Sequence, residues 1–201
     1  STYKNTKAGK FGLGSTFSFH RTKTIVAGEG GVLLLDDDKL FKRAKFLRDH
    51  GRSSEIAYYT LEATPKYMPS NLQASMAWAQ FQRIEELIER KRYLLHRYKG
   101  NLKDIPDLQF NMETDDVVNG VWATTLVFGK SHKMKKLDVI DQLAELDIPA
   151  RPFFYPLSSL PAYPMARVKY ENMNPVAYDI SSRGINLPGS AILTEDQVDW
   201  I

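Results

Sequence analysis

Two apolar segments separated by a polar, glycine-rich loop set the strongest limit on how this chain can fold. Thr16–Phe19 predicts a short buried strand, and Val32–Leu35 predicts a second one. Between them stands Gly28-Glu29-Gly30-Gly31, where glycine permits positive φ and close approach of the backbone to another group. Lys23 is therefore presented from a loop at a strand end, a position where functional side chains often lie.

Lys23 has two interpretations from spacing alone. A lysine held by a tight turn has little freedom to reach into water, and an amine in such surroundings can lose its proton and form a Schiff base with an aldehyde cofactor. A lysine beside glycines can equally be a surface charge near a turn. The spacing leaves both interpretations open.

The wider segment resembles a known family. Phe17-Ser18-Phe19, Lys23 and the glycine run resemble the cofactor-lysine segment of the DegT/DnrJ/EryC1/StrS family, the pyridoxal-phosphate-dependent sugar aminotransferases. The resemblance implies that Lys23 carries the internal aldimine with pyridoxal 5'-phosphate and that Ser18 hydrogen-bonds the cofactor phosphate. It also implies that His20 lies near the sugar site.

The resemblance also implies a fold and a division into domains. The fold is the α/β fold of type I PLP-transferases (aspartate aminotransferase-like). Residues 1–103 would form the C-terminal part of the large PLP-binding domain, including a long linking helix, and residues 104–201 the small C-terminal domain. In the family the lysine lies near the middle of a chain roughly twice this long. We therefore expect this chain to be the C-terminal portion, without the N-terminal half and its partner for the pyridine nitrogen.

Two further segments resemble the same family. Tyr67 and Asn71–Ala74 imply that the preceding loop reaches across a homodimer to the partner's cofactor phosphate, here through Lys66. Met68, however, stands where many members have arginine.

Arg151–Leu157 also matches the family, but Ser158-Ser159 follows where many members have histidine, so the role of that histidine is not transferred. Arg151 could grip a substrate anion through two parallel bonds, or form a surface ion pair.

Composition narrows the class of protein. The chain has 201 residues, 43% of them hydrophobic, which is enough for a globular core. It has no cysteine, and its four histidines show no ligand spacing, so we expect no disulfide framework or metal site and a reducing, cytoplasmic compartment. The net charge of +3 gives little reason to expect nucleic acid, and no apolar run approaches the length of a membrane helix.

Helix signals follow the predicted second strand. Asp36-Asp37-Asp38 suits a helix start, with Leu40, Phe41, Ala44 and Leu47 inward and an end near Gly51. A magnesium site is the alternative, but consecutive carboxylates point in different directions.

Residues 52–69 predict an irregular loop. Ser70 then predicts the cap of one helix over Asn71–Lys99, with Leu72, Met76, Ala77 and Phe81 on its apolar face.

The remaining residues predict a small α/β layer. The pattern indicates a strand over Val121–Phe128, a helix over Leu137–Leu146, and an extended segment over Ala150–Phe154. Thr194-Glu195-Asp196-Gln197 is a capping-box pattern for a last helix.

The function that the resemblance implies is transamination. An amino acid such as glutamate would supply the amine, and a nucleotide-linked keto-deoxysugar would receive it, with a slight similarity to perosamine-type enzymes over Arg151–Pro156. One alternative is an incomplete or structural chain without activity of its own. Another is a dehydratase of the same family, which replaces the lysine with histidine and is therefore disfavoured by Lys23.

Overall fold

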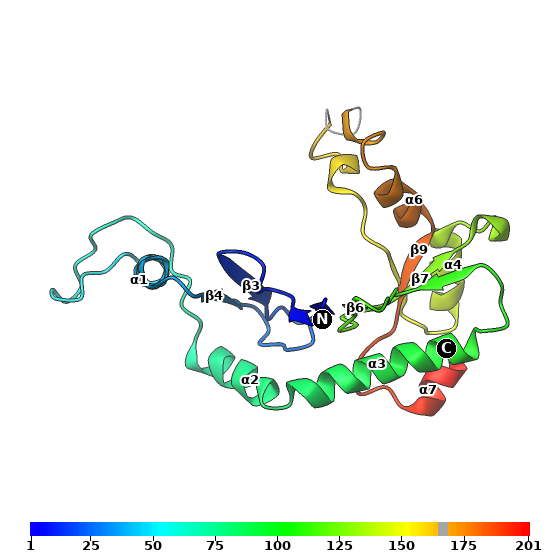
Figure 1. The fold of residues 1–201 in the computed structure, drawn as a ribbon, viewed down its shortest axis with the longest axis horizontal. Coiled ribbons are helices and arrows are strands. Elements are labelled where there is room, and N and C mark those ends of the chain that lie inside the picture. Colours follow the sequence, from blue (N-terminus) through cyan, green and yellow to red (C-terminus); the bar gives the residue numbers. More distant parts are fainter. Residues whose placement is uncertain (165–168) are drawn as a thin grey trace. The chain divides into compact units, whose positions relative to one another are not determined.

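The computed structural model describes residues 1–164 and 169–201 and forms two compact units (Figure 1). Thr2–Leu87 makes up the first, here called the lysine unit, and Ser1 with Ile88–Ile201 makes up the second, the sheet unit. The boundary between the units falls inside a helix. The division of the family's domains after residue 103 stays a prediction.

The lysine unit contains two antiparallel hairpins. β1 (Thr2–Tyr3) pairs with β2 (Thr6–Lys7), and β3 (Gly14–Ser18) pairs with β4 (Gly31–Leu35). Gly31 pairs with Ser18, and a Cβ added at Gly31 would lie 2.7 Å from the Phe17 carbonyl oxygen. Glycine is therefore required where the second strand leaves the loop.

The two predicted strands are present, but the prediction that they are buried is wrong. Phe17 is 44% exposed, Leu33 49% and Leu34 51%. The reason is that β3 and β4 form a two-stranded sheet, so in the described part of the chain no layer covers both of its faces. Apolar strands of this kind are ordinarily buried by further strands and helices.

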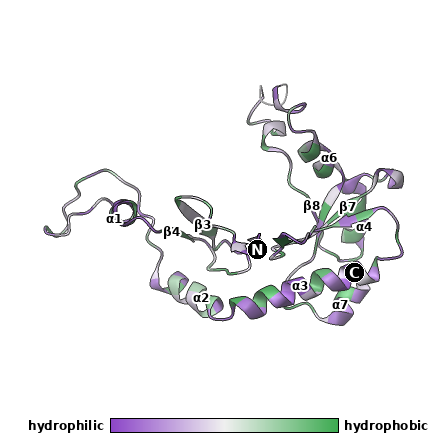
Figure 2. Cartoon of the chain, in the orientation of Figure 1, coloured by the Kyte–Doolittle hydropathy of each residue, from purple (hydrophilic) through white to green (hydrophobic). Residues whose placement is uncertain are grey.

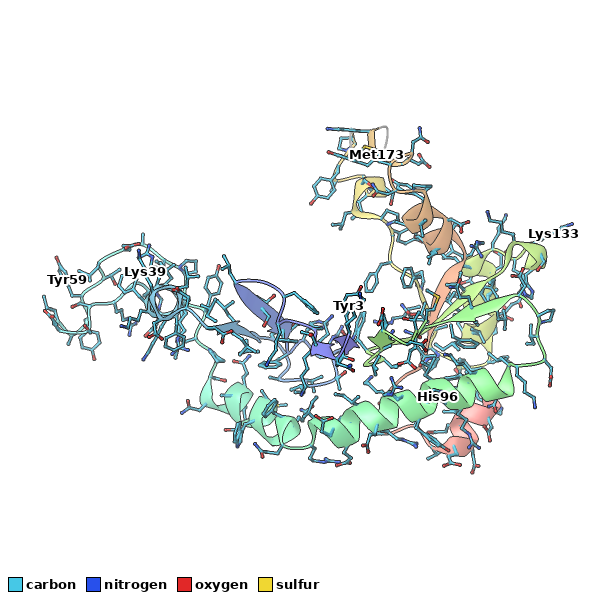
Figure 3. All side chains as sticks on the ribbon, in the orientation of Figure 1. Tyr3, Lys39, Tyr59, His96, Lys133 and Met173 are labelled. Carbon is cyan, nitrogen blue, oxygen red and sulfur yellow. The ribbon has the colours of Figure 1, made fainter. Side chains whose placement is uncertain are left out.

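The helix after β4 begins where its caps predict. The Asp37 carboxylate accepts a hydrogen bond of 2.7 Å from the Leu40 N–H at the start of α1 (Asp38–Leu47), so the aspartates cap a helix. The expected inward side chains are not buried, and Leu40 and Phe41 are 42% and 51% exposed. Residues 52–69 are irregular as predicted, and Tyr59 lies exposed on this loop (Figure 3).

The single helix predicted over Asn71–Lys99 is two helices. α2 (Asn71–Phe81) begins at Ser70 with a complete capping box, as expected, and α3 (Ile84–Asn101) follows after a two-residue turn. The Arg83 N–H bonds to the carbonyl of Gln80, only three residues back, which tightens the backbone and ends the α-helical pattern. The apolar pattern continues through this turn, which is why the sequence did not reveal it.

The sheet unit is built on a four-stranded antiparallel sheet in the order β5-β7-β9-β8. The strands are β5 (Leu108–Phe110), β7 (Thr124–Phe128), β8 (Arg151–Pro152) and β9 (Gly184–Leu187). The other elements are β6 (Val117–Val118), η1 (Lys130–His132), α4 (Lys136–Glu145), η2 (Leu157–Ser159), α6 (Pro175–Arg183) and α7 (Glu195–Trp200). The predicted strand, helix, extended segment and capped last helix of this part are confirmed.

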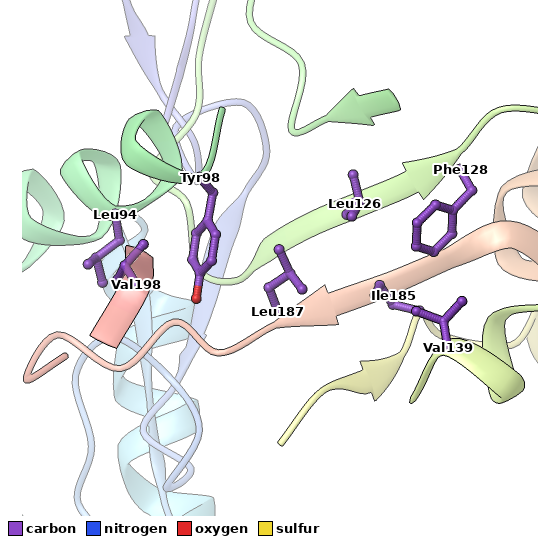
Figure 4. Packing of buried hydrophobic residues seen from close by; sticks show 8 residues of the cluster. All are labelled: Leu94, Tyr98, Leu126, Phe128, Val139, Ile185, Leu187 and Val198. Atoms are coloured by element: carbon purple, nitrogen blue, oxygen red, sulfur yellow. The ribbon is translucent and has the colours of Figure 1, made fainter. Parts of the chain in front are cut away.

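One apolar core holds the sheet unit together (Figure 4). Hydrophilic and hydrophobic residues alternate along α3 (Figure 2), and its apolar stripe faces the sheet. The core comprises Leu94, Tyr98, Leu126, Phe128, Val139, Ile185, Leu187 and Val198. No helix in the described part of the chain is long and apolar enough to span a membrane.

Candidate active site

The loop between β3 and β4 is an ordered extension of their hairpin. Phe19 donates its N–H to the Gly30 carbonyl at 2.8 Å and accepts from the Ala27 N–H at 2.8 Å. Nearer the tip, the Lys23 N–H donates to the His20 carbonyl at 2.9 Å. Lys23 is half-buried. The loop therefore presents this amine from a defined turn.

The polar side chains of the loop contact one another. The Ser18 hydroxyl accepts the His20 N–H at 3.2 Å, so its own hydrogen is left to donate. The His20 ring lies 3.0 Å from the Thr22 hydroxyl through Nδ1 and 3.6 Å from the Glu29 carboxylate through Nε2. Both ends of the His20–Glu29 pair are exposed, so it contributes little stability.

The structure brings some of the predicted site residues together and leaves others apart. Ser18 ends β3, and His20 and Lys23 follow in the loop after it. Lys66 is exposed on another segment of the lysine unit, in a single β-bridge with Asp49. Arg151 belongs to the sheet unit, where it begins β8 and pairs with Asn186.

The loop residues fit two parts of pyridoxal phosphate. The aldehyde requires an amine, which Lys23 offers, and the phosphate requires donors, one of which the Ser18 hydroxyl offers. Gly28 and Gly30 have φ of +79° and +124°, and a Cβ added at either would meet nothing within 4 Å. The turn therefore needs glycine for its conformation and has space beside it.

Sequence reasoning missed the residues that support these segments. The Gln80 side chain makes two hydrogen bonds to the main chain of Val26 in the lysine loop. In the sheet unit, the Lys136 ammonium donates to the Ser181 carbonyl at 2.5 Å and lies 4.0 Å from the centre of the Tyr155 ring. Burial lowers the pKa of Lys136. Both residues act on distant backbone, which no local pattern signals.

Ser158, which follows the Arg151–Leu157 segment, has a structural partner. Ser158 Oγ lies 2.9 Å from the Tyr178 hydroxyl of α6. With Lys136 beside Tyr155, this contact fixes the segment that follows Arg151.

The described chain has a mixed α/β fold, which is also the fold of solved sugar aminotransferases. The solved structure of the putative sugar aminotransferase Spr1654 from Streptococcus pneumoniae, in its PLP form, has the same fold. The TM-score is 0.86 at 23% identity, over 99% of this chain and 52% of that one.

The chain belongs to the DegT/DnrJ/EryC1/StrS aminotransferase family, whose pattern matches residues 1–201. It is 33% identical over 201 residues to a GDP-perosamine synthase of Escherichia coli O157:H7, covering 100% of this chain and 53% of that protein. It is 32% identical over 198 residues to the putative pyridoxal phosphate-dependent aminotransferase EpsN of Bacillus subtilis (strain 168), covering 98% of this chain and 50% of that protein. The chain thus spans about half the length of the curated relatives it matches.

Proposed function

We propose that this chain is the lysine-bearing half of a pyridoxal-phosphate-dependent sugar aminotransferase. The full protein would move an amino group from an amino acid such as glutamate to a nucleotide-linked keto-deoxysugar. The observation that carries the proposal is the loop that orders Lys23 and Ser18 beside an open glycine turn. Membership of the family and the similarity to a GDP-perosamine synthase support the substrate class.

Pyridoxal phosphate, when bound, supplies an aldehyde that takes up the amino group and a conjugated ring that accepts the electron pair. The Lys23 amine would bond to that aldehyde in the resting enzyme and, once released by the donor, move a proton to and from the substrate carbon. The Ser18 hydroxyl would donate to the phosphate. The hydrogen bonds of the loop keep the amine and the hydroxyl in one arrangement.

The remaining residues are assigned on their exposure and charge. Lys66 is exposed and would bind the cofactor phosphate across a homodimer interface as a point charge. Arg151 is exposed and makes no ion pair with another described residue, so its guanidinium would bind a substrate anion. His20 would contact the sugar. The reaction would take place in the cytoplasm.

Reductive labelling of a full-length protein tests the assignment of Lys23. Borohydride reduction with bound pyridoxal phosphate should fix the label on the peptide containing Lys23, and Lys23→Ala should abolish transamination without changing the circular dichroism spectrum. Lys66→Ala serves as the control, since it should weaken cofactor binding but keep the label on Lys23. Label on another lysine, or transfer that survives in Lys23→Ala, would overturn the proposal.

Two further measurements address the alternatives. Sedimentation at micromolar concentration should show a dimer, and a monomer there would contradict the homodimer assignment. Loss of a sugar hydroxyl without amine transfer would identify the protein as a dehydratase. A full-length protein that neither binds the cofactor nor transfers an amine would identify a structural subunit.

A further inference from the structure

We propose that Gln80 is a positioning residue for Lys23: its side-chain amide fixes the lysine loop against helix α2. This inference rests on the proposed function, because it takes Lys23 as the reacting amine. It adds a residue from a different element, more than fifty positions along the chain. Gln80 itself need not touch cofactor or substrate.

Gln80 bonds to both polar groups of one residue in the loop. Its Oε1 accepts the Val26 N–H at 3.1 Å, and its Nε2 donates to the Val26 carbonyl at 2.7 Å. Val26 follows Lys23 by three residues. A primary amide has a donor and an acceptor side by side, so it pairs with a main-chain unit as a neighbouring strand would. Both contacts are partly buried, which strengthens them relative to contacts in water.

The face of α2 that carries Gln80 is built to meet the loop. Gln73, Ala77 and Gln80 stand at spacings of four and three and so share one face of the helix. Ala77, between the two glutamines on this face, is 9% exposed. Gln73 Nε2 donates to the Glu29 carbonyl at 3.3 Å. The most buried face of α2 therefore carries two glutamines, and of the side chains predicted on its apolar face only Ala77 is buried.

Apolar packing contributes little to the order of this loop. Ala27 and Ala77 are the buried hydrophobic residues of the described lysine unit, and both have the smallest side chain that can pack. The larger apolar side chains of α2 point outward, and Leu72 and Phe81 are 72% and 53% exposed. The two hydrogen bonds from Gln80, with the longer one from Gln73, therefore hold the loop to α2. Without them, Val26 would bond to water and the turn that presents Lys23 would sample other conformations.

Three variants of the full-length protein test this role. Gln80→Met keeps the length of the side chain and removes both hydrogen bonds. Gln80→Glu keeps the acceptor but, as a carboxylate, faces the Val26 carbonyl without a donor. Gln82→Met is the matched control, because Gln82 is exposed at the same end of α2 and its side chain makes no hydrogen bond to the described loop. Hydrogen exchange at Val26 reports on the loop without any cofactor.

We expect faster exchange at the Val26 amide in Gln80→Met, with the melting temperature and helix content near those of the control. Trapping of Lys23 by pyridoxal phosphate and cyanoborohydride should slow by about tenfold or more relative to trapping of Lys66, since misplacement of a reacting group costs rate steeply. Gln82→Met should match the parent protein in both measurements.

The pH profile separates positioning from general support of the fold. In Gln80→Glu the trapping rate relative to the parent should rise as the pH falls from 8 toward 5, because a protonated carboxyl group regains a donor for the Val26 carbonyl. A flat ratio, or normal trapping in Gln80→Met despite faster exchange at Val26, would overturn the inference and leave the role of Lys23 intact. A parent protein in which Lys23 is trapped no faster than Lys66 would instead overturn the proposed function.

Discussion

Replacing Tyr98 with phenylalanine tests how the core of the sheet unit depends on pH. Tyr98 is 2% exposed, and its hydroxyl donates to the Pro188 carbonyl at 3.0 Å. Removing the hydroxyl deletes this bond without creating a large cavity. We expect Tyr98→Phe to lower the free energy of unfolding by about 1 kcal/mol at pH 8, the usual net value of one hydrogen bond.

The cost of the substitution should vanish at alkaline pH. Burial raises the pKa of Tyr98 to about 12 in the folded protein, against about 10 in the unfolded chain. The folded state then holds a proton that the unfolded state releases, so this stabilisation is complete below pH 10 and is lost as the pH rises from 10 to 12. By pH 11 the loss is about 1.4 kcal/mol. Tyr98→Phe has no such loss and should equal the parent near that pH.

Urea unfolding followed by tryptophan fluorescence measures this difference. In a Trp78→Phe background the signal comes from Trp122 and Trp200, both in the sheet unit. Burial and the charge of Arg151 lower the pKa of Lys91, which makes stability rise with pH between that lowered pKa and the ordinary one. This opposite slope is present in both proteins and cancels. A stability difference that stays constant from pH 8 to 11 would refute the argument.

Three other substitutions test single contacts. Ser70→Ala removes the N-cap acceptor of α2 and should destabilise the lysine unit by about 1 kcal/mol, measured by urea unfolding with Trp78 as the probe. Arg97→Met removes the partner that lowers the pKa of Asp199 to about 2. In the parent, this pair should protect α7 from hydrogen exchange above about pH 4, and the protection should fall as the pH drops from about 4 to 2. In Arg97→Met this part of the protection should already be absent above pH 4. Gly129→Ala places a Cβ 1.7 Å from the Asp107 carboxyl carbon and should break the bonds of that carboxylate to Ser131, which a lower melting temperature would reveal.

Short-range features of this fold could be predicted from the sequence. Asp37, Ser70 and Thr194 each cap a helix as expected, because a cap depends on residues only three positions away. The strands of the lysine hairpin follow from local apolar runs for the same reason. Ser18, His20 and Lys23 lie together because they are neighbours in the chain.

Long-range features could not be predicted in the same way. The apolar side chains of Leu33 and Leu34 show that this face of the strand favours burial. They do not show whether residues of the same chain cover that face. The contact of Gln80 with Val26 joins residues more than fifty positions apart, and a glutamine on a helix gives no sign of its partner. The role of Lys66 is predicted from resemblance and that of Arg151 from the chemistry of its guanidinium group. Their place in a site depends on how separate segments assemble.

The lysine unit separates two properties that usually depend on the same residues. Its exposed apolar side chains, such as Phe17, Leu33 and Leu34, form the kind of surface that folded proteins cover with other chain segments or subunits. Its loop is ordered instead by hydrogen bonds, those of its own main chain and those of Gln80. Since these bonds are already complete within the unit, covering the apolar surface changes the stability of the unit more than the direction in which it presents Lys23. Substitutions on the exposed strands should therefore change solubility and assembly, whereas substitutions of Gln80 should change the reactivity of the lysine.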